Sequence, residues 1–169
     1  MGKLGRIGVG VDYSAASKSA VRWAIDKLVG AGDSGDVIII LVHVLSPKSD
    51  PINKQLFEDT GSPLIPLEEL NDMNVCKKYG LTPDPEVLDI LNAASMTKGV
   101  EVAAKIYWGD PREKLCDSVE NLKFDVLVLG SRGLGLVQRL LLGSVSTYVV
   151  QNAACPVTVV KTPPAAAKP

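Results

Sequence analysis

D-V-L-V-L-G-S-R-G, residues 125–133, is the stretch of this 169-residue sequence that decides the fold. Its first five residues predict a buried strand, and Gly130 and Gly133 predict a tight turn directly after it. Nine residues further on, Gly143-Ser144 precedes a helix-like stretch, residues 145–150. Glycine lets the backbone approach a ligand closely, and the N-terminus of a helix presents unpaired N–H groups. The spacing therefore predicts an anion site between a strand and a helix.

Predicted strands and helices alternate along the rest of the chain. Ser14 and Asp110-Pro111 are typical helix starts, and a third helix is expected from about Asp84 to Lys98. The predicted strands are Arg6–Val11, Val37–Val44, Val100–Tyr107, Asp125–Leu129 and Pro156–Val160. This alternation predicts an α/β sandwich, in which helices cover both faces of a mostly parallel sheet.

The length is that expected for one domain, which we place at residues 1–162. Residues 46–66 are rich in Pro, Asp, Ser and Asn without any periodicity, so we expect a long flexible insertion. A helical segment is expected over Leu67–Cys76. Residues 163–169 predict a disordered tail.

Composition and charge exclude several classes of function. The net charge of −1 argues against nucleic acid and against an anionic membrane surface as partners. The longest apolar run, Val37 to Val44, is too short to cross a bilayer. Three widely spaced cysteines without a C-x-x-C pair are typical of reduced thiols in an intracellular protein. We therefore expect a cytoplasmic protein that is not bound to a membrane.

The end of the first predicted strand, Gly10-Val11-Asp12-Tyr13-Ser14, is the second place with unusual chemistry. Ligands of open parallel sheets bind at the carboxyl ends of the strands, where the strand order reverses. If the first and fourth strands are neighbours, this segment lies beside Gly130. Asp12 ends a buried strand, so its carboxylate either faces a ligand or helps to cap the following helix.

Two further residues carry the same pair of interpretations. Ser144 is either a phosphate contact or the N-cap of the last helix. Arg132 is either a solvated surface charge or a guanidinium within reach of phosphate. The familiar nucleotide motifs do not match: there is no Walker A sequence, and Tyr13 stands where the third glycine of a G-x-G-x-x-G fingerprint belongs.

Taken together, these residues resemble the universal stress protein family, in its nucleotide-binding branch. Its phosphate motif, G-x2-G-x9-G-[ST], is matched by Gly130, Gly133, Gly143 and Ser144. The family also commonly shows V-D-x-S-x-x-S-x-x-A in the first strand, H-V at the end of the second and C-P-V-x-V-V in the last. These blocks are matched by residues 11–20, 43–44 and 155–160. The insertion and the tail are most similar to plant members.

The resemblance implies a three-layer sandwich of the adenine-nucleotide alpha-hydrolase type, with five parallel strands in the order 3-2-1-4-5. It implies ATP or AMP as ligand. For ATP hydrolysis, which needs a positioned metal, Asp12 is a candidate to hold Mg²⁺ through water. It also implies a homodimer that pairs through the last strand, Val157 to Val160. His43 is then a structural residue rather than a catalyst. The nucleotide-binding residues expected are Gly10, Val11, Asp12, Ser14, Val44, Gly130, Ser131, Arg132, Gly133, Gly143, Ser144, Val145 and Ser146.

Three functions follow as hypotheses. The first is an adenine-nucleotide binding protein of stress response or signalling, acting as a homodimer. The second is a slow ATP hydrolase, although no residue is an evident base for orienting water. The third is a nucleotide-independent, chaperone-like dimeric module, in which the glycines serve only tight packing.

Overall fold

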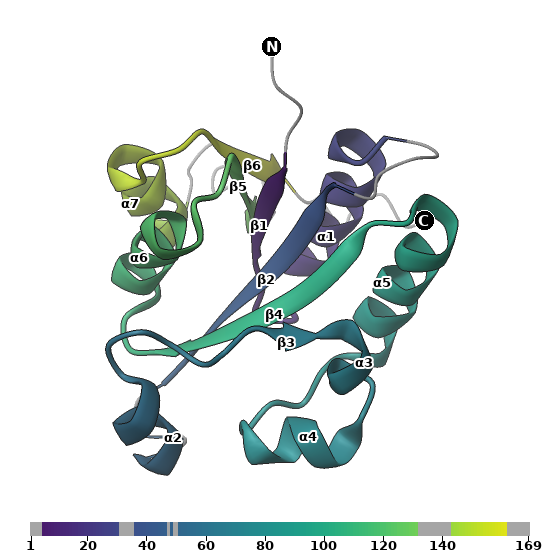
Figure 1. Cartoon of the computed structure of the whole chain (residues 1–169). Helices are drawn as coiled ribbons and strands as arrows, with labels where there is room; N and C mark the ends of the chain where they lie inside the picture. The colour runs from purple at the N-terminus through teal and green to yellow at the C-terminus, as the bar shows by residue number, and fades with distance from the viewer. Residues whose placement is uncertain (1–4, 31–35, 47, 49–50, 132–142, 162–169) are drawn as a thin grey trace, which may run out of the picture.

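The computed structural model describes residues 5–30, 36–46, 48, 51–131 and 143–161, and the fold is given for these residues. Six strands form one sheet in the order β3-β4-β2-β1-β5-β6 (Figure 1). Their bounds are β1 Arg6–Gly10, β2 Ile38–Leu45, β3 Ile65–Pro66, β4 Glu101–Trp108, β5 Val126–Ser131 and β6 Val157–Lys161. β1 pairs in parallel with both β2 and β5, so the first strand lies at the centre of the sheet, beside the strand that precedes Gly130.

The predicted order of the five parallel strands is confirmed, but the expected number of strands is wrong by one. The additional strand, β3, is antiparallel and pairs Ile65 with Ala104 and Pro66 with Ala103 of β4. Proline within a sheet is confined to edges because it lacks an N–H group. β3 lies at such an edge, next to β4.

Seven helices are found in the described residues, and their starts follow local sequence signals. Side chains of Ser14, Asp84 and Asp110 accept hydrogen bonds from the first turns of α1, α5 and α6, as N-caps do. The helices are α1 Ala15–Leu28, α2 Pro51–Phe57, α3 Leu67–Leu70, α4 Met73–Lys78, α5 Pro85–Lys98, α6 Pro111–Leu122 and α7 Ser144–Asn152.

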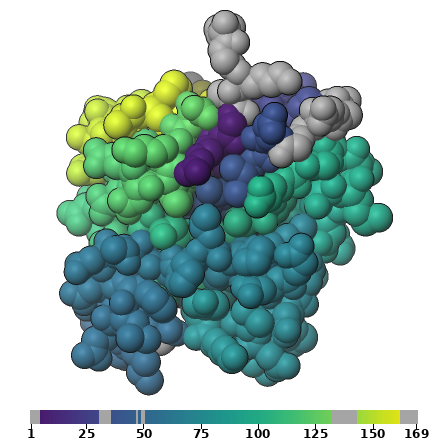
Figure 2. Space-filling model, viewed as in Figure 1, coloured from purple at the N-terminus to yellow at the C-terminus, as the bar shows by residue number. Residues whose placement is uncertain are grey.

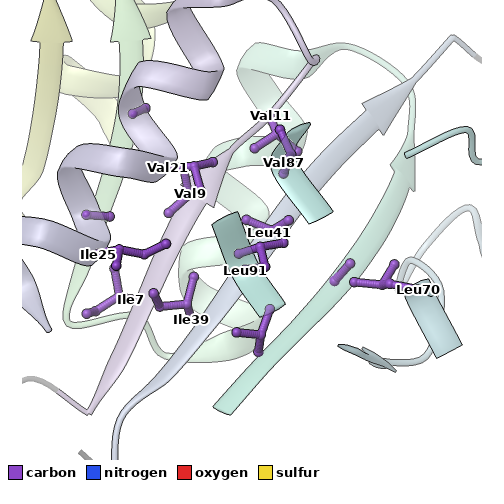
Figure 3. Packing of buried hydrophobic residues seen from close by; sticks show 14 of the residues in the cluster. Ile7, Val9, Val11, Val21, Ile25, Ile39, Leu41, Leu70, Val87 and Leu91 are labelled. Atoms are coloured by element: carbon purple, nitrogen blue, oxygen red, sulfur yellow. The ribbon is translucent and has the colours of Figure 1, made fainter. Parts of the chain in front are cut away.

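The sheet separates two hydrophobic clusters, which makes the three layers of the predicted sandwich. Ile39 and Leu41 of β2 point to the cluster formed with α1 and α5, part of which is shown in Figure 3. Their neighbours Ile40 and Val42 point to the opposite cluster, formed with α6 and α7. Successive residues of a strand face opposite sides of the sheet, so a strand covered on both faces is apolar throughout.

The stretch expected as a flexible insertion, residues 46–66, contains α2 and β3. Ser62 is fully buried, and its backbone N–H donates to Ile106 O at 2.8 Å while its Oγ accepts from Ile106 N at 2.9 Å. The two Ser62 hydrogen bonds thus extend the pairing along the edge of β4. A hydropathy pattern does not predict such pairing, because it depends on a polar side chain. The mobility expected for this stretch stays a prediction.

The helical segment expected over Leu67–Cys76 is divided into α3 and α4. The division falls at Asn71-Asp72, where the Asp72 side chain accepts from Asn74 N at 2.9 Å and begins a new helix. α2 and α4 are joined by a hydrogen bond from Asn53 Nδ2 to Lys78 O, and together they form the lower part of the molecule in Figure 2.

Two expectations concern the membrane and the tail. Among the described residues, no helix has the length and apolar character needed to cross a bilayer. Residues 163–169, the expected tail, lie outside the described residues.

Candidate functional site

A cavity of about 550 Å³ lies at the carboxyl ends of the central strands, as expected for an open parallel sheet. Strands β1, β2 and β5 supply its floor, and the first turns of α1, α6 and α7 surround it. The residues that line it are Gly10, Val11, Asp12, Ser14, Ala16, Ser17, Val42, Val44, Pro111, Leu115, Leu129, Gly130, Ser131, Gly143, Ser144, Val145 and Ser146. Its volume is in the range usual for small-molecule sites.

The turn between β1 and α1 is held by its own side chains. The Asp12 Oδ1 atom accepts from Ser14 N at 2.9 Å, and the Ser14 Oγ atom accepts from Ser17 N at 3.3 Å. Ser17 Oγ donates to Ser14 O at 3.1 Å and also accepts from Asp12 N at 3.3 Å. Asp12 therefore combines the two interpretations left open by the sequence: it stabilises the turn, and it lines the cavity.

Gly130, at the end of β5, is required by packing between two elements of the chain. A Cβ atom built on it would lie 2.1 Å from Ala16 O and 2.4 Å from Ala16 C, both backbone atoms of α1. The first turn of α1 can approach β5 only because this side chain is absent. The expectation that glycine serves ligand approach is therefore not needed to explain this position.

Gly143 is the opposite case. Its backbone conformation, φ −63° and ψ 163°, is open to any residue, and a Cβ atom there would meet no atom of the described residues within 4 Å. The glycine is the N-cap of α7, and Ser144 is the first helical residue, so the alternative of Ser144 as N-cap is wrong. Nothing within the described residues requires a glycine at this position, whereas a ligand lying close to the backbone would require one.

The three helix starts around the cavity differ in how their N–H groups are satisfied. α1 is capped by the Ser14 hydroxyl, and α6 by the Asp110 carboxylate, which accepts from Arg112 N at 2.9 Å. No side chain of the described residues caps α7. Because uncapped N–H groups at a helix start attract anions, α7 is the place in this cavity most suited to negative charge.

Ser146, in the first turn of α7, adds a second polar group to the same wall. It is 6% exposed and lines the cavity. A serine hydroxyl can both donate a hydrogen bond to a ligand and accept one from it. The uncapped helix start and the Ser146 side chain therefore lie on the same wall of the cavity.

His43, adjacent to Val44 on β2, points away from the cavity. Its ring lies edge-to-face against Tyr13, with centroids 5.2 Å apart. Burial lowers the pKa of His43 below its ordinary value, an effect that nearby Asp12 partly opposes. Its Nδ1 atom is buried with no hydrogen-bond partner in the described residues. This placement agrees with the expected structural role.

The structure brings eleven of the thirteen predicted site residues to one cavity, and the other two, Arg132 and Gly133, lie outside the described residues. Residues 134–142, which separate Gly133 from Gly143 in the motif, also lie outside them. Sequence reasoning missed Ala16, Ser17, Val42, Pro111, Leu115 and Leu129. Their only signal was a place beside a predicted strand end or helix start. Among the described residues, no cluster of three His, Cys, Asp or Glu side chains is arranged to hold a metal.

The sequence profile of the Universal stress protein family matches residues 3–161. Universal stress protein A-like protein from Arabidopsis thaliana is 34% identical, over 88% of this chain and 79% of the relative. Universal stress protein PHOS32 from the same plant is 35% identical over 94% of this chain, which spans 65% of that longer relative.

Two solved structures share the fold. A universal stress protein family protein from Arabidopsis thaliana, crystallised with AMP bound, is 27% identical, with a TM-score of 0.57 over 97% of this chain and 95% of that one. Universal stress protein UspA from Lactobacillus plantarum is 20% identical, with a TM-score of 0.60 over 95% and 99% of the two chains. The sheet order, the cavity at its carboxyl edge and these matches agree that the chain belongs to the universal stress protein family.

Proposed function

We propose that this protein binds an adenine nucleotide, ATP or AMP, in the cavity between β1, β5 and α7. The observation that carries the proposal is the start of α7, which no side chain of the described residues caps, with Gly143 and Ser146 lining the cavity beside it. The AMP bound to the Arabidopsis relative supports the choice of an adenine nucleotide.

The proposed orientation follows from the polarity of the walls. The phosphate lies at the start of α7, on the N–H groups near Ser144 to Ser146, where the helix favours negative charge. The base and ribose lie toward Asp12 and Val44, beyond the capped start of α1. Leu115 of α6 supplies an apolar wall. Arg132 and Gly133 remain predicted phosphate contacts, and a Mg²⁺ ion bound with ATP remains a prediction.

The proposal includes a homodimer formed through β6, within a cytoplasmic protein of stress response or signalling. The two edges of the described sheet differ: one is the two-residue strand β3, which includes Pro66, whereas the other is the five-residue strand β6. Val157 to Val160 of β6 are half-buried rather than buried. An apolar edge strand is a liability unless something pairs with it, and a second copy supplies an identical strand.

The first experiment identifies any nucleotide that the purified protein releases on denaturation, by chromatography and mass spectrometry. Stoichiometric ATP or AMP is the expected result. ADP recovered after the emptied protein is incubated with ATP would indicate turnover. No released nucleotide, together with no thermal shift in millimolar ATP or AMP, would contradict the proposal and favour the nucleotide-independent module.

A matched pair of glycine variants tests the position of the phosphate. Gly143→Ala adds a methyl group to the open space before α7, and Gly30→Ala adds one where there is also no atom within 4 Å, remote from the cavity. We expect Gly143→Ala to weaken ATP and AMP binding in calorimetry and Gly30→Ala to leave it unchanged. Equal affinities in the two variants would refute phosphate binding at the start of α7.

A further inference from the structure

Tyr13 lies between two residues of the cavity, Asp12 and Ser14, yet it does not line the cavity itself. Its side chain packs on the other face of the sheet, against the hydrophobic cluster that α1 and α5 share with β1 and β2. There its ring meets the His43 ring edge-to-face, with 5.2 Å between centroids. The β1–α1 turn is therefore attached to one face of the sheet and presents its polar groups to the other.

The backbone of Tyr13 makes this arrangement unusual. Its φ of 63° is in the left-handed region, which bulky L-residues rarely adopt because the side chain then crowds the backbone. Such a conformation persists only where surrounding contacts maintain it. The contacts here are those of the ring, whose burial is deep enough to raise the pKa of Tyr13 to about 12.

The polar groups on either side depend on the same conformation. Asp12 Oδ1 reaches Ser14 N across the turn, and Ser14 Oγ then caps Ser17 N. If Tyr13 relaxed to a negative φ, the chain direction between Asp12 and Ser14 would change. Asp12 and Ser14 would then lose the hydrogen bond that joins them and their present positions in the cavity wall.

We propose that Tyr13 is a positioning residue of the nucleotide site: its ring, held against His43 and the core, keeps the left-handed turn that sets Asp12 and Ser14 in the cavity. The inference rests on the proposed nucleotide binding and goes beyond it, because Tyr13 itself touches no ligand. It predicts that affinity depends on a ring and a backbone conformation on the far face of the sheet.

Three variants separate the ring from the backbone. Tyr13→Phe keeps the ring and loses the hydroxyl, Tyr13→Ala loses the ring and keeps the Cβ atom, and Tyr13→Gly loses both the ring and the steric penalty at φ 63°. ATP and AMP affinity is measured by calorimetry, and circular dichroism establishes that each variant is folded. Amide hydrogen exchange at Ser17 and Lys18, whose N–H groups bond to Ser14, follows the turn without any ligand.

We expect Tyr13→Phe to bind within about twofold of the unmodified protein, since the ring contacts remain. Tyr13→Ala is expected to bind about tenfold more weakly, which corresponds to ~1.4 kcal/mol and lies within the usual penalty of a left-handed residue. Tyr13→Gly is expected to bind more tightly than Tyr13→Ala, because glycine adopts a φ of 63° without steric cost. Amide exchange at Ser17 and Lys18 is expected to be fastest in Tyr13→Ala.

Unchanged affinity and unchanged exchange in a folded Tyr13→Ala protein would overturn the inference. Equal losses in the alanine and glycine variants would overturn the role of the backbone conformation. If the unmodified protein binds no nucleotide, the proposed function is wrong whatever the variants show. Amide exchange at Ser17 and Lys18, measured without ligand, then decides separately whether Tyr13 maintains the turn.

Discussion

Gly130→Ala is the substitution for which the structure gives the sharpest expectation. The new methyl carbon would lie 2.1 Å from Ala16 O, 2.4 Å from Ala16 C and 3.0 Å from Ser17 N. Each of these atoms belongs to the backbone of α1, so no side chain can rotate away. The helix must move from β5, or β5 must bend.

The size of the effect follows from this contact. Overpacking costs about 1–3 kcal/mol in protein cores, and a clash with helix backbone, which cannot rotate away, lies at the upper end, ~3 kcal/mol. For a chain of this length, that loss lowers Tm by about 6–12 °C. The assay is thermal unfolding followed by circular dichroism, in the absence of nucleotide, so that binding makes no contribution.

Gly143→Ala is the control, because it belongs to the same motif. Its methyl group enters open space at an ordinary φ, which stabilises by up to about 1 kcal/mol through the reduced freedom of the unfolded chain, while alanine is a poorer N-cap than glycine. These effects oppose each other, so we expect the stability to change by less than about 1 kcal/mol. The two glycines are thus expected to differ: Gly130 is needed for folding, and Gly143 for the proposed binding. A Gly130→Ala protein with an unchanged Tm would refute the account of the contact between α1 and β5.

Three further predictions concern other parts of the molecule. Burial lowers the pKa of His43, so the unfolded chain binds the imidazole proton more readily than the folded chain does. The contribution of His43 to folding stability should therefore be fully present above about pH 6.5 and should fall as the pH drops further. Urea unfolding at about pH 7.5 and 5.5 should show a smaller fall in His43→Leu. An equal pH dependence in the two proteins would contradict this. Trp108→Phe should change the free energy of unfolding by less than about 1 kcal/mol, since it keeps the stacking on Phe57 and removes a buried Nε1–H that has no acceptor in the described residues. A loss of ~3 kcal/mol in urea unfolding would contradict this expectation. Thr158→Lys places like charges on the two paired β6 strands of the proposed dimer, so the mass measured by sedimentation should fall from that of two copies to that of one. The control Thr97→Lys, on α5, should leave the mass unchanged. If the unmodified protein already sediments as a monomer, the proposed dimer is excluded.

The parts of the fold that sequence analysis predicted are those with local causes. The side chains of Ser14, Asp84 and Asp110 cap helices within three residues of themselves, so their effect is visible in a short window. The central strands are uniformly apolar because both of their faces are covered. β3 has no such signal, since its pairing depends on Ala103 and Ala104, some forty residues away.

The candidate site was predictable where its chemistry departs from that of a core, and not elsewhere. Asp12, Gly130 and Gly143 are unusual residues at a strand end or a helix start, and they do meet in one cavity. Leu115 and Leu129 have the spacing of core residues, and nothing in sequence tells an apolar cavity wall from an apolar interior. The contact that Gly130 makes with α1 was equally hidden, because it joins segments more than a hundred residues apart.

The short antiparallel strand β3 has a consequence for how copies of this protein assemble. A sheet with two available edges adds a neighbour on each side, and such growth continues into a fibre. Here β3 is only two residues long and includes Pro66, which has no N–H group to donate, so this edge offers little backbone for another strand. The five-residue strand β6, at the other edge of the described sheet, is the better place for a second copy. When two copies pair through β6, both β6 edges are used, and the β3 edges that remain give little support to further growth of the sheet.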